Sequence, residues 1–572
     1  MSGDLAFEWA RVLVHALVEA GVRFAVASPG SRSTPLVLAA AAEPRLCLDV
    51  IVDERSAAFF ALGAARVSGR PSALVCTSGS AGAHYLPAIL EAQRSLLPLI
   101  AITADRPWEV EQLHANQTLD QSHLFGGHVR QSLQLGEPDP ARLAYVPRIA
   151  ALAVLRATSP VGGPVHLNAR FRKPLEPGVG GALRTPSAVP RLERAHSAAL
   201  EVPTGVRDAV ARARRGLVVC GPRRGAALGD ARLRQALGRF ASARGFAVLA
   251  EVTSGVAHGP ECTTLPAFDA WLPRAVAEGD APDLVIEIGS PPTSSAWERL
   301  AGGLGATPRI VVSEDGLPDP TATASLIVEA NPTQLFDALE ASGPSDPSWL
   351  ERLGARARQA EALLSEALAG TALTEPVVVE RVFDAVPTGG AIFIGNSLPV
   401  RDADWFAPRS SRALTVLHQR GLSGIDGLIA GAAGARRALP PEAPLFALIG
   451  DVSALHDVGS LAVLARAAGA VTLVVIDNGG GRIFAELPVA QAVSAATLEH
   501  LFLTPPPAFL EHASRAFGLA YTRVETRAEL ERALEAPAGA PRVLHVVVPA
   551  DDGRTRRRAL RESLTRAPAV TA

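Results

Sequence analysis

The chain has 572 residues, of which 48% are hydrophobic and 20% are charged, so it can bury sizeable cores. Its 55 basic and 57 acidic residues give a formal net charge of −2, which argues against a disordered, nucleic-acid-binding or anionic-membrane-binding protein. No run of about 18 uncharged apolar residues is present, so we expect no membrane span. The four cysteines form no CxxC pair, and Lys173, the only lysine, precedes a proline, which excludes a Walker-A loop. These features are typical of a large cytoplasmic enzyme.

Short apolar strands alternate with helix-forming sequence in the first part of the chain. Residues 22–27, 46–52, 72–77 and 97–103 are predicted to be buried strands, and helix-forming sequence follows each. This alternation predicts a parallel sheet that is covered by helices on both faces.

The same alternation recurs twice. The further predicted strands are residues 216–221, 246–251, 283–290 and 309–314, and then 391–397, 413–417, 445–451, 471–478 and 543–549. Residues 173–190 and 341–348 are rich in Gly, Pro and Ser and are predicted to be linkers. We therefore predict an α/β protein of three doubly wound parallel-sheet domains, at residues 1–185, 205–345 and 370–572. The basic run 554–562 is expected to be a solvated helix face rather than a binding patch.

Polar side chains follow two consecutive strands of the third unit. Gly450 and Asp451 end one strand, and Asn478 ends the next, 27 residues after Asp451. Parallel strands with one helix between them place these residues side by side at the carboxyl edge of the sheet. Carboxylate and amide oxygens suit Mg²⁺, and a helix starting near Ser453 would direct its free N–H groups at a phosphate. An ordinary strand–helix turn with a capping aspartate is the alternative. No GxGxxG follows any strand, which disfavours a standard dinucleotide fold.

This spacing resembles the fingerprint of thiamine-diphosphate-dependent enzymes. The resemblance implies that Asp451, Asn478 and the carbonyl of Gly480 hold Mg²⁺, or Mn²⁺ in its place, on the diphosphate of the cofactor. It implies a pyrimidine-binding domain at 1–185, a diphosphate-binding domain at 370–572, and an active site shared between two chains of a homodimer or dimer of dimers. The other residues expected beside the cofactor are Ser397, Gly450, Ser453, Ile483 and Phe484.

Such enzymes need a glutamate that faces the aminopyrimidine, and Glu54 follows the predicted strand 46–52. Its carboxylate would protonate the pyrimidine N1′, so that the neighbouring imino group becomes basic enough to deprotonate the thiazolium carbon. Alternatively, Glu54 is a first-turn residue that favours the helix dipole.

Five further motifs narrow the resemblance. They are SPGSRSTPL (28–36), TADRP (103–107), HANQ (114–117), GNSLPVRD (395–402) and RGLSGIDGL (420–428). Together they resemble the MenD family of menaquinone biosynthesis, which makes 2-succinyl-5-enolpyruvyl-6-hydroxy-3-cyclohexene-1-carboxylate from 2-oxoglutarate and isochorismate. The resemblance covers both outer domains and not the middle one. Asp477 stands where the family commonly has a second Asn, and the contact of Arg482 does not follow from the motif.

Substrates with several carboxylates call for arginines, whose planar forks bind carboxylates bidentately. The expected substrate-binding residues are Ser31, Arg32, Arg106, Asn116, Gln117, Arg401 and Arg420. Surface ion pairs are the alternative for any single arginine. By resemblance, Ile425 is the bulky residue under the cofactor, although an isoleucine there is also consistent with core packing.

Two other functions stay open at the level of sequence. One is another thiamine-diphosphate enzyme, either a 2-oxoacid decarboxylase or a carboligase similar to acetolactate synthase. The other is a non-catalytic cofactor-binding sensor, which Glu54 disfavours because binding alone does not need that carboxylate.

Overall fold

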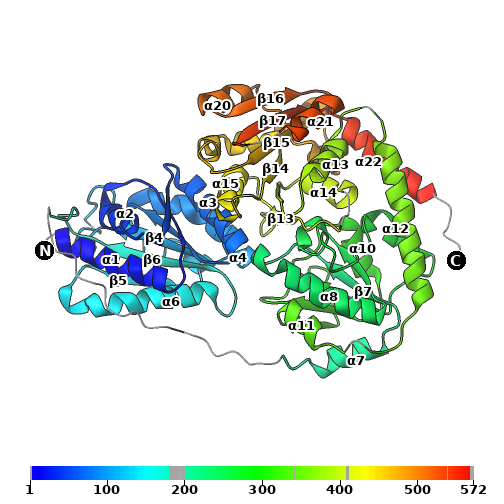
Figure 1. Ribbon diagram of the computed structural model, residues 1–572, viewed down its shortest axis with the longest axis horizontal. Coiled ribbons are helices and arrows are strands. Elements are labelled where there is room, and N and C mark those ends of the chain that lie inside the picture. Colours follow the sequence, from blue (N-terminus) through cyan, green and yellow to red (C-terminus); the bar gives the residue numbers. More distant parts are fainter. Residues whose placement is uncertain are drawn as a thin grey trace.

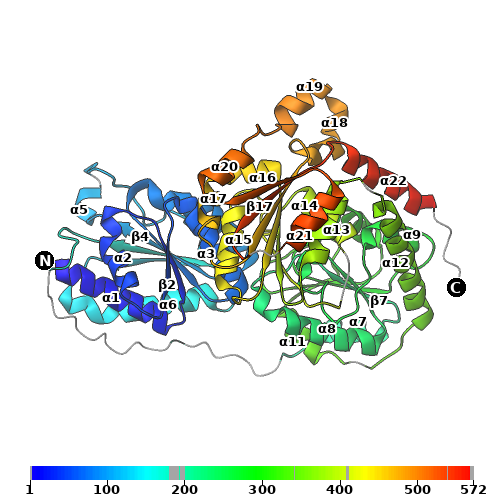
Figure 2. The same ribbon diagram turned by 45° about the horizontal axis from the view of Figure 1, so that its top comes forward.

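The computed structural model describes residues 3–111, 113–178, 192, 200–340, 342–370, 372–407, 411–536 and 539–566. Within these residues the strands form three separate sheets, each packed against helices (Figures 1 and 2). The first and third sheets have six strands and the middle sheet has five. All paired strands run parallel. The predicted fold class, three parallel-sheet α/β domains, is confirmed.

The N-terminal sheet has the strand order β2-β1-β3-β4-β6-β5. Its strands are β1 (Phe24–Ala27), β2 (Cys47–Val50), β3 (Ser72–Cys76), β4 (Leu99–Asp105), β5 (Ser132–Gly136) and β6 (Pro164–Arg170). Its helices are α1 (Gly3–Glu19), α2 (Thr34–Ala41), α3 (Glu54–Ser68), α4 (Leu86–Ser95), α5 (Trp108–Glu111) and α6 (Val146–Thr158). Helices α1, α2 and α6 cover one face of the sheet, and α3 and α4 cover the other.

The central sheet has the order β11-β10-β9-β7-β8. Its strands are β7 (Gly216–Cys220), β8 (Ala247–Ala250), β9 (Leu284–Ile288), β10 (Arg309–Ser313) and β11 (Leu326–Glu329). Its helices are α7 (Thr204–Arg212), α8 (Asp230–Arg244), α9 (Phe268–Ala277), α10 (Ser295–Gly303) and α11 (Pro332–Ala338).

The C-terminal sheet has the order β13-β12-β14-β15-β17-β16. Its strands are β12 (Ala391–Ile394), β13 (Thr415–His418), β14 (Leu445–Gly450), β15 (Val471–Asp477), β16 (Ala520–Val524) and β17 (Arg542–Val547). Its longer helices are α12 (Pro347–Leu368), α13 (Glu375–Ala385), α14 (Leu398–Phe406), α15 (Leu428–Ala438), α21 (Arg527–Glu535) and α22 (Asp552–Arg566). Its shorter helices are α16 (Asp451–His456), α17 (Leu461–Leu464), α18 (Val489–Ala492), α19 (Ala495–Leu498) and α20 (Leu510–Ala516).

Four strands escape the sequence prediction: β5, β6, β11 and β16. Three of them are edge strands with few buried residues, so they carry no continuous apolar run. β6 lies inside the N-terminal sheet, but His166 and Asn168 interrupt its apolar residues and hydrogen-bond within the sheet. Polar residues that find partners in the fold therefore hide this strand from a hydrophobicity pattern.

The linker predicted at 341–348 is only partly right, because α12 begins inside it. Pro347 occupies the first turn, where its missing N–H costs nothing, and Asp346 caps the helix by accepting from the Trp349 N–H at 3.0 Å. α12 then runs along one side of the molecule, beside α9 and α22 (Figure 1). Residues 179–190 of the other predicted linker lie outside the described residues.

The basic run 554–562 forms part of α22, and the predicted solvated face describes only one side of that helix. Arg558 is exposed, whereas Arg557 is buried. The Arg557 guanidinium donates to both carboxylate oxygens of Asp402 at 2.9 Å and to Glu486 at 2.7 Å. These ion pairs dock α22 onto α14 and the segment after β15.

The hydrophobic cores continue across the domain boundaries. α3 of the N-terminal domain packs against α15 of the C-terminal domain within one core. A Cβ on Gly63 would lie 2.0 Å from the Gly431 carbonyl oxygen, and one on Gly434 would lie 1.8 Å from the Phe60 carbonyl oxygen. Only glycine permits so close an approach, which fixes the N-terminal domain against the C-terminal domain. No described helix combines the length and apolar character needed to cross a membrane.

Candidate active site

The carboxyl ends of β14 and β15 bring three predicted residues together. The two strands pair in parallel, so Asp451 and Asn478 leave the sheet at the same edge. The Asp451 carboxylate accepts from the Gly480 N–H at 2.6 Å. Asp451, Asn478 and Gly480 therefore form one cluster.

The donor set of this cluster fits a hard divalent cation. The Asn478 amide nitrogen donates to Glu375 at 3.0 Å, which turns the amide oxygen away from Glu375. Gly480 has φ +113°, and a Cβ there would lie 2.2 Å from the Leu503 carbonyl oxygen, so this turn requires glycine. Nothing lies within 4 Å of a Cβ placed on Gly450, which leaves room beside the cluster. A carboxylate, an amide oxygen and a backbone carbonyl are ligands of the kind Mg²⁺ prefers.

Carboxylate and imidazole side chains alone do not form a cation site at this edge. No group of three or more His, Cys, Asp or Glu side chains in the described parts of the chain is arranged to hold a metal. A cation at this edge would therefore need the amide and carbonyl oxygens as well.

The helix after β14 begins earlier than predicted. Gly450 is extended, with φ −87° and ψ 165°, and acts as the N-cap, so α16 starts at Asp451 rather than near Ser453. Ser453 lies buried in the first turn. Ile483 and Phe484 follow in a 3-10 turn, where the Phe484 ring packs 5.7 Å from that of Phe502.

The carboxyl groups of Asp451 and Asp477 both lie at this edge, and their surroundings shift their pKa values in opposite directions. Burial raises the pKa of Asp451 to about 6. A hydrogen bond from His545, at 2.8 Å, lowers the pKa of Asp477. Asp477 thus pairs with His545, and Arg482, whose contact the sequence left open, donates to the Asn478 carbonyl at 3.0 Å. Both contacts brace the turn that carries Asn478.

A second set of predicted residues surrounds the loop 419–427. Arg420 donates to the Asn396 side chain at 2.9 Å and to Thr293 of the central domain at 3.0 Å. Asn396 is buried and donates in turn to the carbonyls of Gln419 and Gly424. The sequence analysis selected Ser397 and overlooked Asn396, although both belong to the GNS motif.

Ser397, Arg401 and Ile425 belong to the same region. Ser397 has φ +70°, an uncommon conformation for a residue with a side chain, and its carbonyl accepts from Arg401 at 2.8 Å. Arg401 therefore lies on α14 rather than in a loop. Ile425 is half-buried in the loop 419–427 and is not part of the hydrophobic core.

A third set lies at the carboxyl edge of the N-terminal sheet. Arg32 is buried, its guanidinium donates to the Phe171 carbonyl at 2.7 Å, and its backbone N–H donates to Thr77. Burial and the neighbouring Arg106 lower the pKa of Arg32. The positive charge of Arg106 thus disfavours the charge of Arg32, and a bound anion would offset this repulsion.

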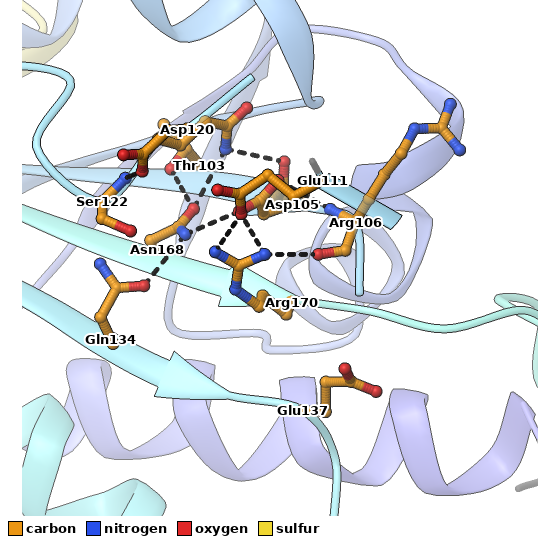
Figure 3. A network of polar contacts seen from close by, with 12 residues as sticks. Thr103, Asp105, Arg106, Glu111, Asp120, Ser122, Gln134, Glu137, Asn168 and Arg170 are labelled. Atoms are coloured by element: carbon orange, nitrogen blue, oxygen red, sulfur yellow. Dashed lines mark hydrogen bonds and ion pairs between the residues drawn. The ribbon is translucent and has the colours of Figure 1, made fainter. Parts of the chain in front are cut away.

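Figure 3 shows the polar network that supports Arg106. Asp105 accepts from the Arg106 backbone N–H at 2.8 Å and from the Asn168 side chain at 2.9 Å. Arg170 donates to the Arg106 carbonyl at 3.0 Å and pairs with Glu111. These contacts hold the backbone of Arg106, and Figure 3 shows its side chain pointing away from the network.

The remaining N-terminal residues of the set are on the surface. Ser31 is exposed at the start of a short 3-10 helix, and Asn116 and Gln117 are exposed in a loop. The Gln117 amide donates to the Ser78 carbonyl at 2.9 Å, which ties its loop to the one that follows β3.

Glu54 begins α3, directly after β2, and is half-buried. Its neighbour Asp53 provides the cap by accepting from the N–H groups of Arg55 and Ser56. The Arg55 guanidinium reaches the His456 carbonyl at 3.3 Å, at the end of α16 opposite to Asp451. The N-terminus of α3 therefore meets the C-terminal domain within the same chain.

A cavity of about 820 Å³ lies between the central and C-terminal domains. Arg401 and Ile483 of the predicted set line it, together with Arg274 and Arg299 of the central domain and Arg561 of α22. The sequence analysis missed the last three, because only the tertiary structure brings them to the segment after Asn478.

Comparisons with known proteins agree with this architecture. Residues 7–124 match the family described as thiamine pyrophosphate enzyme, N-terminal TPP binding domain, and residues 404–548 match the corresponding C-terminal TPP binding domain. The fold and these two matches define a thiamine-diphosphate-dependent enzyme.

Three curated relatives share the name 2-succinyl-5-enolpyruvyl-6-hydroxy-3-cyclohexene-1-carboxylate synthase. The protein of Sorangium cellulosum is 46% identical, over 97% of this chain and 94% of its own length. Those of Myxococcus xanthus and Geobacillus kaustophilus are each 38% identical, over 93% and 92% of this chain and the same shares of their own lengths. The chain belongs to this synthase family.

Proposed function

We propose that the protein decarboxylates 2-oxoglutarate and adds the remaining four-carbon unit to isochorismate in menaquinone biosynthesis. The products are 2-succinyl-5-enolpyruvyl-6-hydroxy-3-cyclohexene-1-carboxylate and CO₂. The observation that carries the proposal is the arginine-lined cavity, because it adjoins the turn after Asn478 and matches substrates that bear several carboxylates. The shared name of the relatives supports the same reaction.

The cofactor would be held at the carboxyl edge of the C-terminal sheet. Asp451, Asn478 and the Gly480 carbonyl would bind Mg²⁺ or Mn²⁺ on the diphosphate, and Ile425 would support the cofactor from below. The flanking residues expected beside the cofactor are Ser397, Gly450, Ser453, Ile483 and Phe484. When bound, thiamine diphosphate supplies a carbon nucleophile that adds to the 2-oxo group and takes up the electron pair left by CO₂.

Glu54 would hold a proton at the pyrimidine N1′ atom. The half-buried carboxylate of Glu54 lies at the start of α3, near the carboxyl end of β2. Asp53 already provides the cap of that helix. Glu54 is thus available for proton chemistry.

The arginines would position the two acids. Arg32 and Arg106 form one pair, while Arg401 and Arg420 flank the cavity region of the C-terminal domain. Ser31, Asn116 and Gln117 would add neutral hydrogen bonds on the N-terminal side.

A homodimer, alone or paired into a dimer of dimers, would complete the site. Two exposed valines precede Glu54, because Val50 is 44% exposed and Val52 is 80% exposed. A cavity of about 550 Å³ beside them is lined by Val50, Phe60 and Val463. Burial of such a surface by a second copy would be favourable. Sedimentation as a monomer at assay concentrations would contradict this assembly.

Substrate choice tests the proposed function. The wild type should decarboxylate 2-oxoglutarate in preference to pyruvate. Arg401→Ala should lower kcat/KM for 2-oxoglutarate about ten- to a hundredfold, because it removes a charge-assisted hydrogen bond, and should leave pyruvate unaffected. Arg558→Ala, at an exposed arginine of α22, serves as the control. Equal use of pyruvate by the wild type would instead support a carboligase similar to acetolactate synthase.

A further inference from the structure

A buried carboxylate of the N-terminal domain accepts two hydrogen bonds from the loop that carries Arg420 and Ile425. Glu91, on α4, is only 4% exposed. One of its oxygens accepts from the Gly421 N–H at 2.9 Å, and the other accepts from the Leu422 N–H at 2.7 Å. These two bonds cross from one domain to the other.

The fit around this contact is close. A Cβ on Gly421 would lie 2.8 Å from a carboxylate oxygen of Glu91 and 2.8 Å from the hydroxyl of Ser95. The loop is therefore pressed against α4, and its distance from Glu91 is set by direct contact.

Two further groups of the N-terminal domain hold the Glu91 carboxylate. The Ser95 hydroxyl donates to it at 2.7 Å, and the Arg66 guanidinium lies 3.3 Å away. Arg66 is fully buried, and burial lowers its pKa to about 10, so it stays charged at neutral pH. Both groups contact the oxygen that binds Gly421, so the second oxygen serves the Leu422 N–H.

The same loop is tied to the other two domains. Thr293 of the central domain accepts from Arg420, and Asn396 of the C-terminal domain accepts from Arg420 and donates to the Gly424 carbonyl at 2.7 Å. Three residues, Thr293, Asn396 and Glu91, therefore hold this loop. Glu91 is the charged one, and it contacts the residues directly after Arg420. A shift of the loop away from Glu91 would therefore move Arg420 and Ile425 together.

We propose that Glu91 is a positioning residue that sets Arg420 toward the substrate and Ile425 toward the cofactor. The inference rests on the proposed function, since it assigns those two tasks to the loop. A purely structural ion pair with Arg66 would not need the contact between the second oxygen and the Leu422 N–H.

Glu91→Asp tests this role, because it keeps the negative charge beside Arg66 but is one methylene too short to reach both loop amides. We expect kcat/KM for 2-oxoglutarate to fall about tenfold or more, as loss of a charge-assisted hydrogen bond implies. Affinity for thiamine diphosphate, measured by fluorescence titration with Mg²⁺, should also fall. Ser95→Ala is the matched control, since it removes a bond to the same carboxylate but leaves both bonds between Glu91 and the loop amides in place.

A double-mutant cycle separates positioning from stability. In an Arg420→Ala background, assayed at saturating thiamine diphosphate so that any effect through Ile425 on cofactor binding is removed, Glu91→Asp should lower kcat/KM by less than about threefold, because the remaining effect runs through Arg420. Gly421→Ala, which pushes the loop off Glu91 without touching Arg66, should reproduce the loss and provides the test if Glu91→Asp does not fold. Additive effects, or an equal loss in Ser95→Ala, would overturn the proposal. A wild type without 2-oxoglutarate turnover would overturn the proposed function instead, and the cofactor titration would still test the loop.

Discussion

Two adjacent carboxylates at the start of α3 have separate tasks. Asp53 satisfies the free N–H groups of the first turn, and Glu54 follows it without contributing to that cap. The stability of α3 and the proposed proton chemistry therefore depend on different side chains, which makes them separable by mutation.

Glu54→Gln should abolish most activity and preserve folding. The amide keeps the size of the side chain but cannot hold the proton, so kcat should fall by about 10²- to 10⁴-fold. Thermal unfolding and steady-state kinetics measure the two effects. Asp53→Ala is the control, with a loss of about 0.5–2 kcal/mol in stability and a smaller loss of activity. Near wild-type turnover of Glu54→Gln would refute the assigned role.

Asp451→Ala should weaken cofactor binding far more than folding. It removes the only charged ligand of the proposed metal site, so affinity for thiamine diphosphate with Mg²⁺ should drop more than about tenfold. Calorimetric titration of wild type and variant measures this. Asp477→Asn should have a smaller effect, because Asp477 binds His545 and Gly479. An unchanged titration for Asp451→Ala would exclude the metal assignment.

Individual site residues differ in how far the sequence predicts them. Asp451 and Asn478 follow neighbouring strands, so simple topology brings them together. Glu91 contacts a segment distant in sequence, and no local pattern marks it. Asn396 lies in the GNS motif, but its contact with Gly424 becomes visible only in the fold. Arg299 is one arginine among many until the fold places it on the cavity.

At the scale of elements, ion pairs hold the C-terminal helix α22 against the rest of the C-terminal domain. Burial raises the pKa of Asp402 to about 7, and one guanidinium nitrogen of Arg557 donates to both carboxylate oxygens at 2.9 Å. Arg557 also binds Glu486 in the turn that carries Ile483 and Phe484. These ion pairs therefore connect α22 with the carboxyl edge of the C-terminal sheet, which is proposed to hold the cofactor.

Arg557→Ala should destabilise the protein, because it leaves the Asp402 carboxylate buried without its partner. Removing one member of a buried pair costs about 3–5 kcal/mol. Urea unfolding of Arg557→Ala beside Arg558→Ala, the exposed neighbour, provides the comparison. Equal midpoints for the two variants would mean that α22 is not held by this ion pair.

The elements themselves follow closely from hydrophobic patterning where they are buried. The buried strands are predicted except β6, whose apolar residues are interrupted by His166 and Asn168. The half-exposed edge strands β5, β11 and β16 are not predicted. α12 begins in a stretch that resembles a linker, since Pro347 and Asp346 are typical both of turns and of helix starts.

At the scale of the whole molecule, the candidate site draws on all three domains. At the loop 419–427, the N-terminal domain contributes Glu91, the central domain contributes Thr293 and the C-terminal domain contributes Asn396. The central domain carries no motif that the sequence analysis could use, yet it lines the arginine-rich cavity. Its role becomes visible only in the assembled fold.

The most direct test is to identify the product. The purified protein is incubated with 2-oxoglutarate, thiamine diphosphate and Mg²⁺, with and without isochorismate, and the products are analysed by mass spectrometry. We predict that CO₂ is released from 2-oxoglutarate and that 2-succinyl-5-enolpyruvyl-6-hydroxy-3-cyclohexene-1-carboxylate is formed only when isochorismate is present. If 2-oxoglutarate were not consumed, or if isochorismate were left unchanged, the account would be contradicted.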